Sequence, residues 1–298
     1  MTDIQSQISD IQSQLESAYP PDEAKALAWW ILEETTGLSR SQLLSGCKIT
    51  KNISNLQEKT DANGDLQEII TRLLNFEPVQ YIFGHTLWSG LDLLVTPATL
   101  IPRPETAELV ERINEKMVNE KMIKCLDIGT GSGCIAIALK KQHPEWSVTG
   151  IDISPEAIEV ARQNAIRNNV EVNFQVADIF DETTNDKSPI TNNKYDIVVS
   201  NPPYVRESEK SSMKSNVLDH EPASALFVPD SDPLRFYRRI AELFAQRPMT
   251  NDQRLDLFFE INENLSVETE NLLRSLGYSD IQTYTDIYSK PRFIHAIF

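Results

Sequence analysis

A short segment of the chain carries the residue types that a reaction at a planar nitrogen would need. It reads Asn201-Pro202-Pro203-Tyr204 and follows the apolar run 195–200. An amide or aryl amino nitrogen is a poor nucleophile because its lone pair is delocalised into a π system. The Asn201 side-chain carbonyl and the Pro202 backbone carbonyl could accept both of its N–H bonds, while Tyr204 packs against the planar group. We expect orientation and electrostatic support, with no general base, to provide the catalysis.

Three glycines alternate along the segment after the apolar run 123–128. This segment, Gly129-Thr130-Gly131-Ser132-Gly133, leads into a helical pattern. Such a turn lets a ligand approach the backbone closely and presents the amides of a helix N-terminus to it. A dinucleotide-binding loop would place its third glycine at position 134, where this chain has Cys134. The spacing therefore departs from the dinucleotide pattern.

Acidic residues follow the next two predicted strands. Asp152 ends the run 147–151, where its carboxylate could accept hydrogen bonds from two ribose hydroxyls. Asp178 and Ile179 follow the next strand, where an adenine amino group and ring would lie. Together with the glycine loop, these positions resemble the S-adenosylmethionine-dependent methyltransferase superfamily. The resemblance implies that S-adenosylmethionine is the cofactor, bound by residues 129–133, Asp152, Asp178, Ile179 and Asn201.

Other segments resemble one family within that superfamily. They are Ile101-Pro102-Arg103-Pro104-Glu105-Thr106, preceded by Gln80-Tyr81-Ile82 and Gly84, and His220-Glu221-Pro222 followed by Ala225-Leu226. Both are similar to the peptide chain release factor N5-glutamine methyltransferases (PrmC/HemK family), over nearly the whole chain and least in the N-terminal part. The resemblance implies methylation of the glutamine side-chain amide nitrogen in the Gly-Gly-Gln motif of release factors. Release factors would then be the protein partners, and translation termination would be modulated.

Three segments depart from the pattern of that family. The usual Glu-Ile-Gly is Glu260-Ile261-Asn262, the Gly-Gly after Ala-Leu is replaced by residues 227–230, and a Gly-x-x-Arg is replaced by residues 289–292. None of them changes the cofactor glycines or residues 201–204, so we expect the activity to be retained.

Arg103 and Glu105 admit two interpretations. Pro104 and Glu105 could simply begin a helix, with Glu105 favoured by the helix dipole and Arg103 in solvent. The family resemblance instead places both at the rim of the cofactor and substrate pocket. We therefore predict that Arg103 and Glu105 bind substrate together with Asn201, Pro202, Pro203 and Tyr204.

The elements that must position these residues alternate between strands and helices over residues 101–298. Strands are predicted at 123–128, 147–151, 171–175, 195–200, 256–261, 280–286 and 292–297. Helices are predicted from the 101–106 segment to about 119, and at 133–142, 155–168, 233–245 and 265–275. This alternation indicates an α/β fold with a doubly wound, mostly parallel, Rossmann-like sheet that ends on an antiparallel strand. The polar stretch 181–194 is expected to form a mobile surface loop.

The N-terminal part has a different pattern, which predicts a small all-α domain over residues 1–76; the family resemblance implies that this domain recognises the substrate. Helical periodicity is found at 4–15, 24–32 and 69–74, with the polar stretch 51–64 as an exposed connection. Residues 77–100 predict a β-hairpin linker, with strands at 81–83 and 91–95. Residues 101–298 would form the S-adenosylmethionine-binding catalytic domain.

The composition argues against several classes of function. The 298 residues include 28 Lys and Arg against 44 Asp and Glu, a net charge of −16, so direct nucleic-acid binding is not expected. No apolar run reaches the roughly 18 residues of a membrane span and no secretory signal is present, so we expect a cytoplasmic protein without membrane contact. The cysteines and histidines are scattered along the chain, and no metal site is expected.

Two alternative functions stay open. The Asn-Pro-Pro-Tyr segment also occurs in enzymes that methylate adenine or cytosine nitrogens, so N6-adenine methylation of DNA or RNA is the alternative activity. A binding module that retains S-adenosylmethionine without catalysis is the other alternative, and the intact residues 201–204 argue against it.

Overall fold

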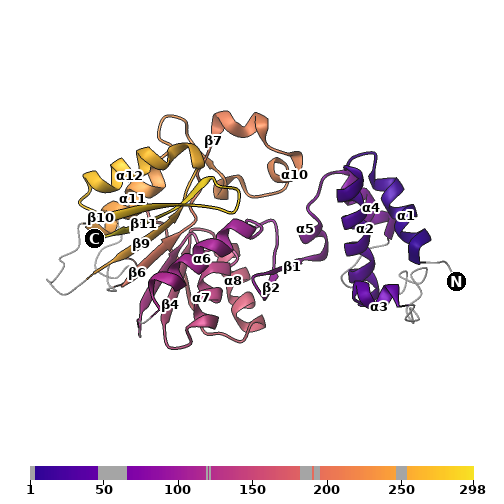
Figure 1. Ribbon diagram of the computed structural model, residues 1–298, viewed down its shortest axis with the longest axis horizontal. Helices are drawn as coiled ribbons and strands as arrows, with labels where there is room; N and C mark the ends of the chain where they lie inside the picture. The colour runs from indigo at the N-terminus through magenta and orange to yellow at the C-terminus, as the bar shows by residue number, and fades with distance from the viewer. Residues whose placement is uncertain are drawn as a thin grey trace. The chain divides into compact units, whose positions relative to one another are not determined.

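The computed structural model describes residues 4–45, 66–118, 120, 122–181, 190, 195–245 and 254–298 (Figure 1). They form two compact units, one within Met1–Gly84 and Lys214–His220, the other within His85–Met213 and Glu221–Phe298. The predicted connection 51–64 and nearly all of the predicted loop 181–194 lie outside the described residues. The division at residues 76 and 100 stays a prediction.

The first unit consists of helices, as the periodicity predicts. They are α1 (Ile4–Leu15), α2 (Pro21–Thr36), α3 (Arg40–Leu44), α4 (Leu66–Leu74), α5 (Val79–Phe83) and α10 (Ser215–Leu218). Leucine and isoleucine side chains of α1, α2 and α4 share one buried core. Helix α2 ends at Gly37, whose positive φ of 68° lets its N–H donate to the Glu33 carbonyl at 2.8 Å.

The predicted strand at 81–83 is wrong, because these residues belong to helix α5. Pro78 precedes the helix and its carbonyl accepts from the Ile82 N–H at 3.1 Å, while Gly84, with φ of 75°, ends it. Burial of apolar side chains on one helical face overrides the strand propensity of this segment. The hairpin instead pairs β1 (His85–Trp88) with β2 (Leu91–Leu94) in antiparallel register.

The second unit contains a seven-stranded sheet with the order β10-β11-β9-β6-β3-β4-β5. The strands are β3 (Lys124–Ile128), β4 (Ser147–Asp152), β5 (Asn173–Val176), β6 (Ile197–Ser200), β9 (Asp256–Glu260), β10 (Ser279–Thr285) and β11 (Pro291–Ile297). Neighbours from β5 to β9 are parallel, and β11 is antiparallel to both β9 and β10. The doubly wound, mostly parallel α/β sheet and its antiparallel end are confirmed.

Helices cover both faces of this sheet (Figure 1). They are α6 (Pro104–Lys116), α7 (Cys134–Gln142) and α8 (Pro155–Arg167) on one face, and α11 (Arg235–Ala245) and α12 (Ser266–Ser275) on the other. Side chains of β6 alternate between the two cores, with Ile197 and Val199 packed in one and Val198 in the other. Of the described helices, none has the length and apolarity to cross a bilayer.

The strand order places the predicted site at the reversal point of the sheet. The chain runs from β3 outward to β4 and β5 and then returns to β6 on the other side of β3. The carboxyl ends of β3 and β6 therefore border the crevice where ligands bind in such sheets. A second, two-stranded parallel sheet of β7 (Val205–Arg206) and β8 (Phe227–Val228) follows β6 and was not predicted, because strands of this length carry no periodic signal.

Candidate active site

A cavity of about 470 Å³ lies at the carboxyl ends of β3, β4 and β6, within the size range of small-molecule sites. Most predicted site residues line it: Arg103, Gly129, Thr130, Gly131, Ser132, Asp152, Asp178, Ile179, Asn201, Pro202 and Pro203. Glu105, Gly133 and Tyr204 are not among the lining residues.

The glycine loop is held in a conformation that requires glycine. Gly129, Gly131 and Gly133 have φ values of 71°, 53° and 81°. A Cβ atom at Gly133 would lie 3.0 Å from Phe174 and 3.1 Å from Ala161. Gly133 thus allows α7 to approach the sheet. In a dinucleotide-binding loop the third glycine has this packing role, but it would stand at position 134.

The Asp152 carboxylate is fixed at the cavity wall by backbone amides. Its Oδ2 accepts from the Gly131 N–H at 2.9 Å, and its Oδ1 accepts from the Ser154 N–H at 3.0 Å. Burial raises the pKa of this carboxyl, and these hydrogen bonds oppose the rise. Carboxylate oxygens have further lone pairs, so both can also accept from ligand hydroxyls.

Asp178 is placed by a local turn. Its Oδ1 accepts from the Phe180 N–H at 2.8 Å. Asp178 and the buried Ile179 both line the cavity, and their contacts with an adenine stay a prediction.

Two buried side chains near the site, those of Asp127 and Cys134, have pKa values above their ordinary ones. Asp127 is fully buried beneath the glycine loop, and burial raises the pKa of its carboxyl to about 7. Its Oδ2 accepts from the Thr130 hydroxyl at 2.6 Å, which holds the loop to β3. Burial also raises the pKa of the Cys134 thiol to about 12, so this cysteine, which packs in the core beside the cavity, is protonated at neutral pH.

Asn201 is oriented by residues far away in the sequence. Its Nδ2 donates to the Thr106 hydroxyl oxygen at 3.2 Å, and the Thr106 hydroxyl donates to Glu260 Oε2 at 2.8 Å. At the preceding position, the Ser200 hydroxyl donates to the Ile128 carbonyl at 2.6 Å and ties the end of β6 to β3. The Asn201 side chain therefore lies on a rigid edge of the sheet.

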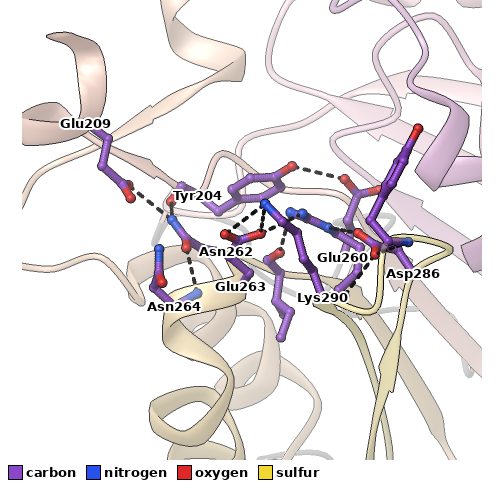
Figure 2. A network of polar contacts seen from close by, with 11 residues as sticks. Tyr204, Glu209, Glu260, Asn262, Glu263, Asn264, Asp286 and Lys290 are labelled. Atoms are coloured by element: carbon purple, nitrogen blue, oxygen red, sulfur yellow. Dashed lines mark hydrogen bonds and ion pairs between the residues drawn. The ribbon is translucent and has the colours of Figure 1, made fainter. Parts of the chain in front are cut away.

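Tyr204 packs against the core on the α11 face. Its hydroxyl donates to Glu260 Oε1 at 3.1 Å, and its carbonyl accepts from Asn262 Nδ2 at 3.1 Å (Figure 2). Burial and the nearby Glu260 raise the pKa of Tyr204, so the hydroxyl stays a neutral donor. The expected contact of its ring with a substrate stays a prediction.

Arg103 lies at the cavity with its guanidinium fixed by a buried acid. Its Nη2 donates to Glu221 Oε1 at 2.6 Å, and Glu221 Oε2 accepts from the Ile101 N–H at 3.1 Å. The Arg103 carbonyl accepts from the Trp88 indole at 2.7 Å. Glu105 is in the first turn of α6, where an acidic residue suits the helix dipole. Substrate contacts of Arg103 and Glu105 stay predictions.

Thr106, Glu221 and Glu260 were not predicted from the sequence to take part in the site. All three lie in segments that were compared with the family pattern, and this comparison was the one signal in the sequence that could have pointed to them. Their side-chain hydrogen-bond partners are 56 to 154 residues away, so no local pattern could reveal their roles. Among the residues that the structure describes, no group of three His, Cys, Asp or Glu side chains could hold a metal ion.

A comparison with solved structures supports the fold. The hMettl16 catalytic domain in complex with the MAT2A 3'UTR hairpin 6 superimposes with a TM-score of 0.54, covering 75% of this chain and 82% of that chain. The two sequences are 17% identical, so this likeness concerns the fold alone.

Sequence comparisons identify the family. Residues 8–84 match the profile described as "PrmC N-terminal domain", and residues 105–226 match "Methyltransferase small domain". The release factor glutamine methyltransferase of Bacteroides thetaiotaomicron is 42% identical over 286 residues, which are 96% of this chain and 97% of that protein. The enzyme of the same name from Flavobacterium psychrophilum is 42% identical, with 95% of each chain covered. The chain therefore belongs to the release factor glutamine methyltransferase family.

Proposed function

We propose that the protein transfers a methyl group from S-adenosylmethionine to the side-chain amide nitrogen of the glutamine in the Gly-Gly-Gln motif of peptide chain release factors. Membership of the release factor glutamine methyltransferase family supports the substrate, and the orientation of Asn201 at the cavity is the structural observation that supports transfer to a planar nitrogen. The side-chain nitrogen of Asn201 donates to Thr106, so its carbonyl oxygen is turned the other way as an acceptor. The proposed reaction modulates translation termination and takes place in the cytoplasm.

The residues around the cavity fit the proposed cofactor. The positive-φ glycines leave backbone accessible at Gly129 and Gly131, where a Cβ atom would meet nothing closer than 4.0 Å. The Asp152 carboxylate, fixed by two amides, can accept from ribose hydroxyls, and Asp178 with Ile179 can hold an adenine. When bound, S-adenosylmethionine supplies an electrophilic sulfonium methyl group.

The residues 201–204 supply orientation in the proposed reaction. Asn201 Oδ1 and the Pro202 carbonyl accept the two N–H bonds of the substrate amide and turn the nitrogen lone pair toward the methyl group. Positive charge would develop on the nitrogen as it took the methyl group that a bound S-adenosylmethionine would supply. The two acceptors stabilise this charge, and the nitrogen then releases one proton to water.

A labelling experiment tests this function against the nucleic-acid alternative. The protein is incubated with methyl-labelled S-adenosylmethionine and, separately, a release factor, duplex DNA and single-stranded DNA. We expect label in the release factor alone, located on the Gly-Gly-Gln glutamine by mass spectrometry, and none when that glutamine is replaced by alanine. Label that appears only in nucleic acid would overturn the proposal.

A further inference from the structure

Glu260 lies at the end of β9 and receives two hydroxyl hydrogens from the site. The residue is 1% exposed, and each carboxylate oxygen has one of the two partners. Oε2 accepts from the Thr106 hydroxyl at 2.8 Å, and Oε1 accepts from the Tyr204 hydroxyl at 3.1 Å. Burial raises the pKa of this carboxyl, and the two hydrogen bonds and the charge of Arg292 oppose the rise. In its ionised form the carboxylate is an acceptor only and satisfies both donors at once.

The direction of these hydrogen bonds sets the orientation of the Asn201 amide. A threonine hydroxyl has one hydrogen, and that of Thr106 is donated to Glu260. The Thr106 oxygen can therefore only accept from Asn201, and Nδ2 lies 3.2 Å from it. Rotating the amide by 180° would bring two oxygens together without a hydrogen between them. The Asn201 carbonyl oxygen is thus turned away from Thr106.

We propose that Glu260 is a positioning residue for methyl transfer, which acts through the Thr106 hydroxyl to keep the Asn201 carbonyl directed at the substrate amide. The inference rests on the proposed function. With the amide reversed, Asn201 would present N–H donors to the N–H donors of the substrate, so the acceptor that orients the nitrogen would be lost.

The same carboxylate also connects Asn201 to the rest of its loop. Tyr204, three residues later, donates to Glu260 through its hydroxyl, and its carbonyl accepts from Asn262 at 3.1 Å (Figure 2). Asn262 Nδ2 also donates to Glu209 Oε2 at 3.1 Å. Asn262 stands where the family usually has glycine, which has no side chain to make these bonds. Both ends of the 201–204 loop are therefore fixed by residues at the end of β9.

The direct test removes the Thr106 hydroxyl and leaves its volume unchanged. With cofactor and release factor saturating, we expect Thr106→Val to lower kcat about tenfold, the effect of losing one neutral hydrogen bond from the orientation of the acceptor. Thr106→Ser restores the hydroxyl and is expected to recover most of kcat. Thr269→Val is the matched control, because this fully buried threonine donates to the Leu265 carbonyl just before α12 and is not among the residues that line the cavity.

A second variant tests Glu260 itself. In Glu260→Gln one acceptor oxygen becomes a donor, so one of the two hydroxyls must reverse, and kcat is expected to fall while the melting temperature stays within a few degrees. In a double-mutant cycle with Thr106→Val, the two losses in kcat are expected to be less than additive. Both variants interrupt the same relay, the two hydrogen bonds that connect Glu260 through Thr106 to Asn201.

The outcomes separate the inference from the function on which it rests. Wild-type kcat in Thr106→Val, an equal loss in Thr269→Val, or full additivity in the cycle would each overturn the inference while the wild type still methylates the release factor. A wild-type chain without activity on release factors would overturn the proposed function, and the inference with it.

Discussion

The substitution Gly133→Ala tests the packing of the glycine loop against the sheet. Two separate costs follow from the structure. The φ of 81° places an alanine in the left-handed region, which costs about 1–2 kcal/mol. The new Cβ would also lie 3.0–3.1 Å from Phe174, Ala161 and Ile137, and overpacking of this kind costs about 1–3 kcal/mol more. We expect Gly133→Ala to lower the unfolding free energy of the second unit by about 2–5 kcal/mol.

Gly90→Ala is the matched control for the backbone cost. Gly90 belongs to the same compact unit and has a similar φ of 76°, but a Cβ atom there would meet nothing within 4 Å. It should therefore cost only the backbone part, about 1–2 kcal/mol. The difference between the two variants measures the packing of α7 against the sheet.

Amide hydrogen exchange in β3 and β4 is the assay, because it reports the opening of the second unit separately from the first. Calorimetry with S-adenosylmethionine should also show weaker binding in Gly133→Ala, since α7 and the loop before it must shift. If the protection lost in Gly133→Ala is no larger than in Gly90→Ala, the packing argument is refuted.

Three further changes test other parts of the structure. Burial raises the pKa of Asp127 to about 7, so the stability that this group provides at low pH is lost as the pH rises from about 4 to about 7. From pH 5 to pH 8, the unfolding free energy measured in urea should therefore decrease by about 3 kcal/mol more in the wild type than in Asp127→Asn. Equal decreases would refute the raised pKa of Asp127. Asp152→Ala should weaken cofactor binding by about 1–3 kcal/mol in calorimetry, whereas unchanged affinity would show that the ribose contact is misplaced. Asn262→Ala removes the donor to the Tyr204 carbonyl and to Glu209, and should lower the unfolding free energy by about 1–3 kcal/mol; an unchanged denaturation midpoint would contradict this.

The sheet and its helices could be predicted because each element carries a periodic apolar pattern of sufficient length. The buried run 195–200 and the amphipathic run 155–168 correspond to β6 and α8 within a few residues. The local pattern predicted the wrong element at α5. This five-residue segment is rich in residues that favour strands, but its burial and the flanking Pro78 and Gly84 make it a helix. The local pattern also failed at β7 and β8, which are two residues each.

The cofactor side of the site could be predicted because its residues follow one another along the sequence. Gly129 directly follows β3, Gly131 lies two residues further on, and Asp152 is the last residue of β4, so the topology brings them together. The support of Asn201 could not be predicted in this way. Its relay to Glu260 spans two hydrogen bonds between distant segments, and only the folded chain shows which oxygen accepts from which hydroxyl.

Turnover of the Asn201→Ala variant is the measurement that tests the proposed mechanism most directly. If the Asn201 carbonyl orients the substrate amide, kcat with saturating cofactor should fall about 10²–10³-fold, as for the loss of one preorganised polar group, while the fold stays intact. Methylation of the Gly-Gly-Gln glutamine is followed by mass spectrometry in the variant and the wild type. Near-normal formation of methylated glutamine by Asn201→Ala under these conditions would contradict the mechanism.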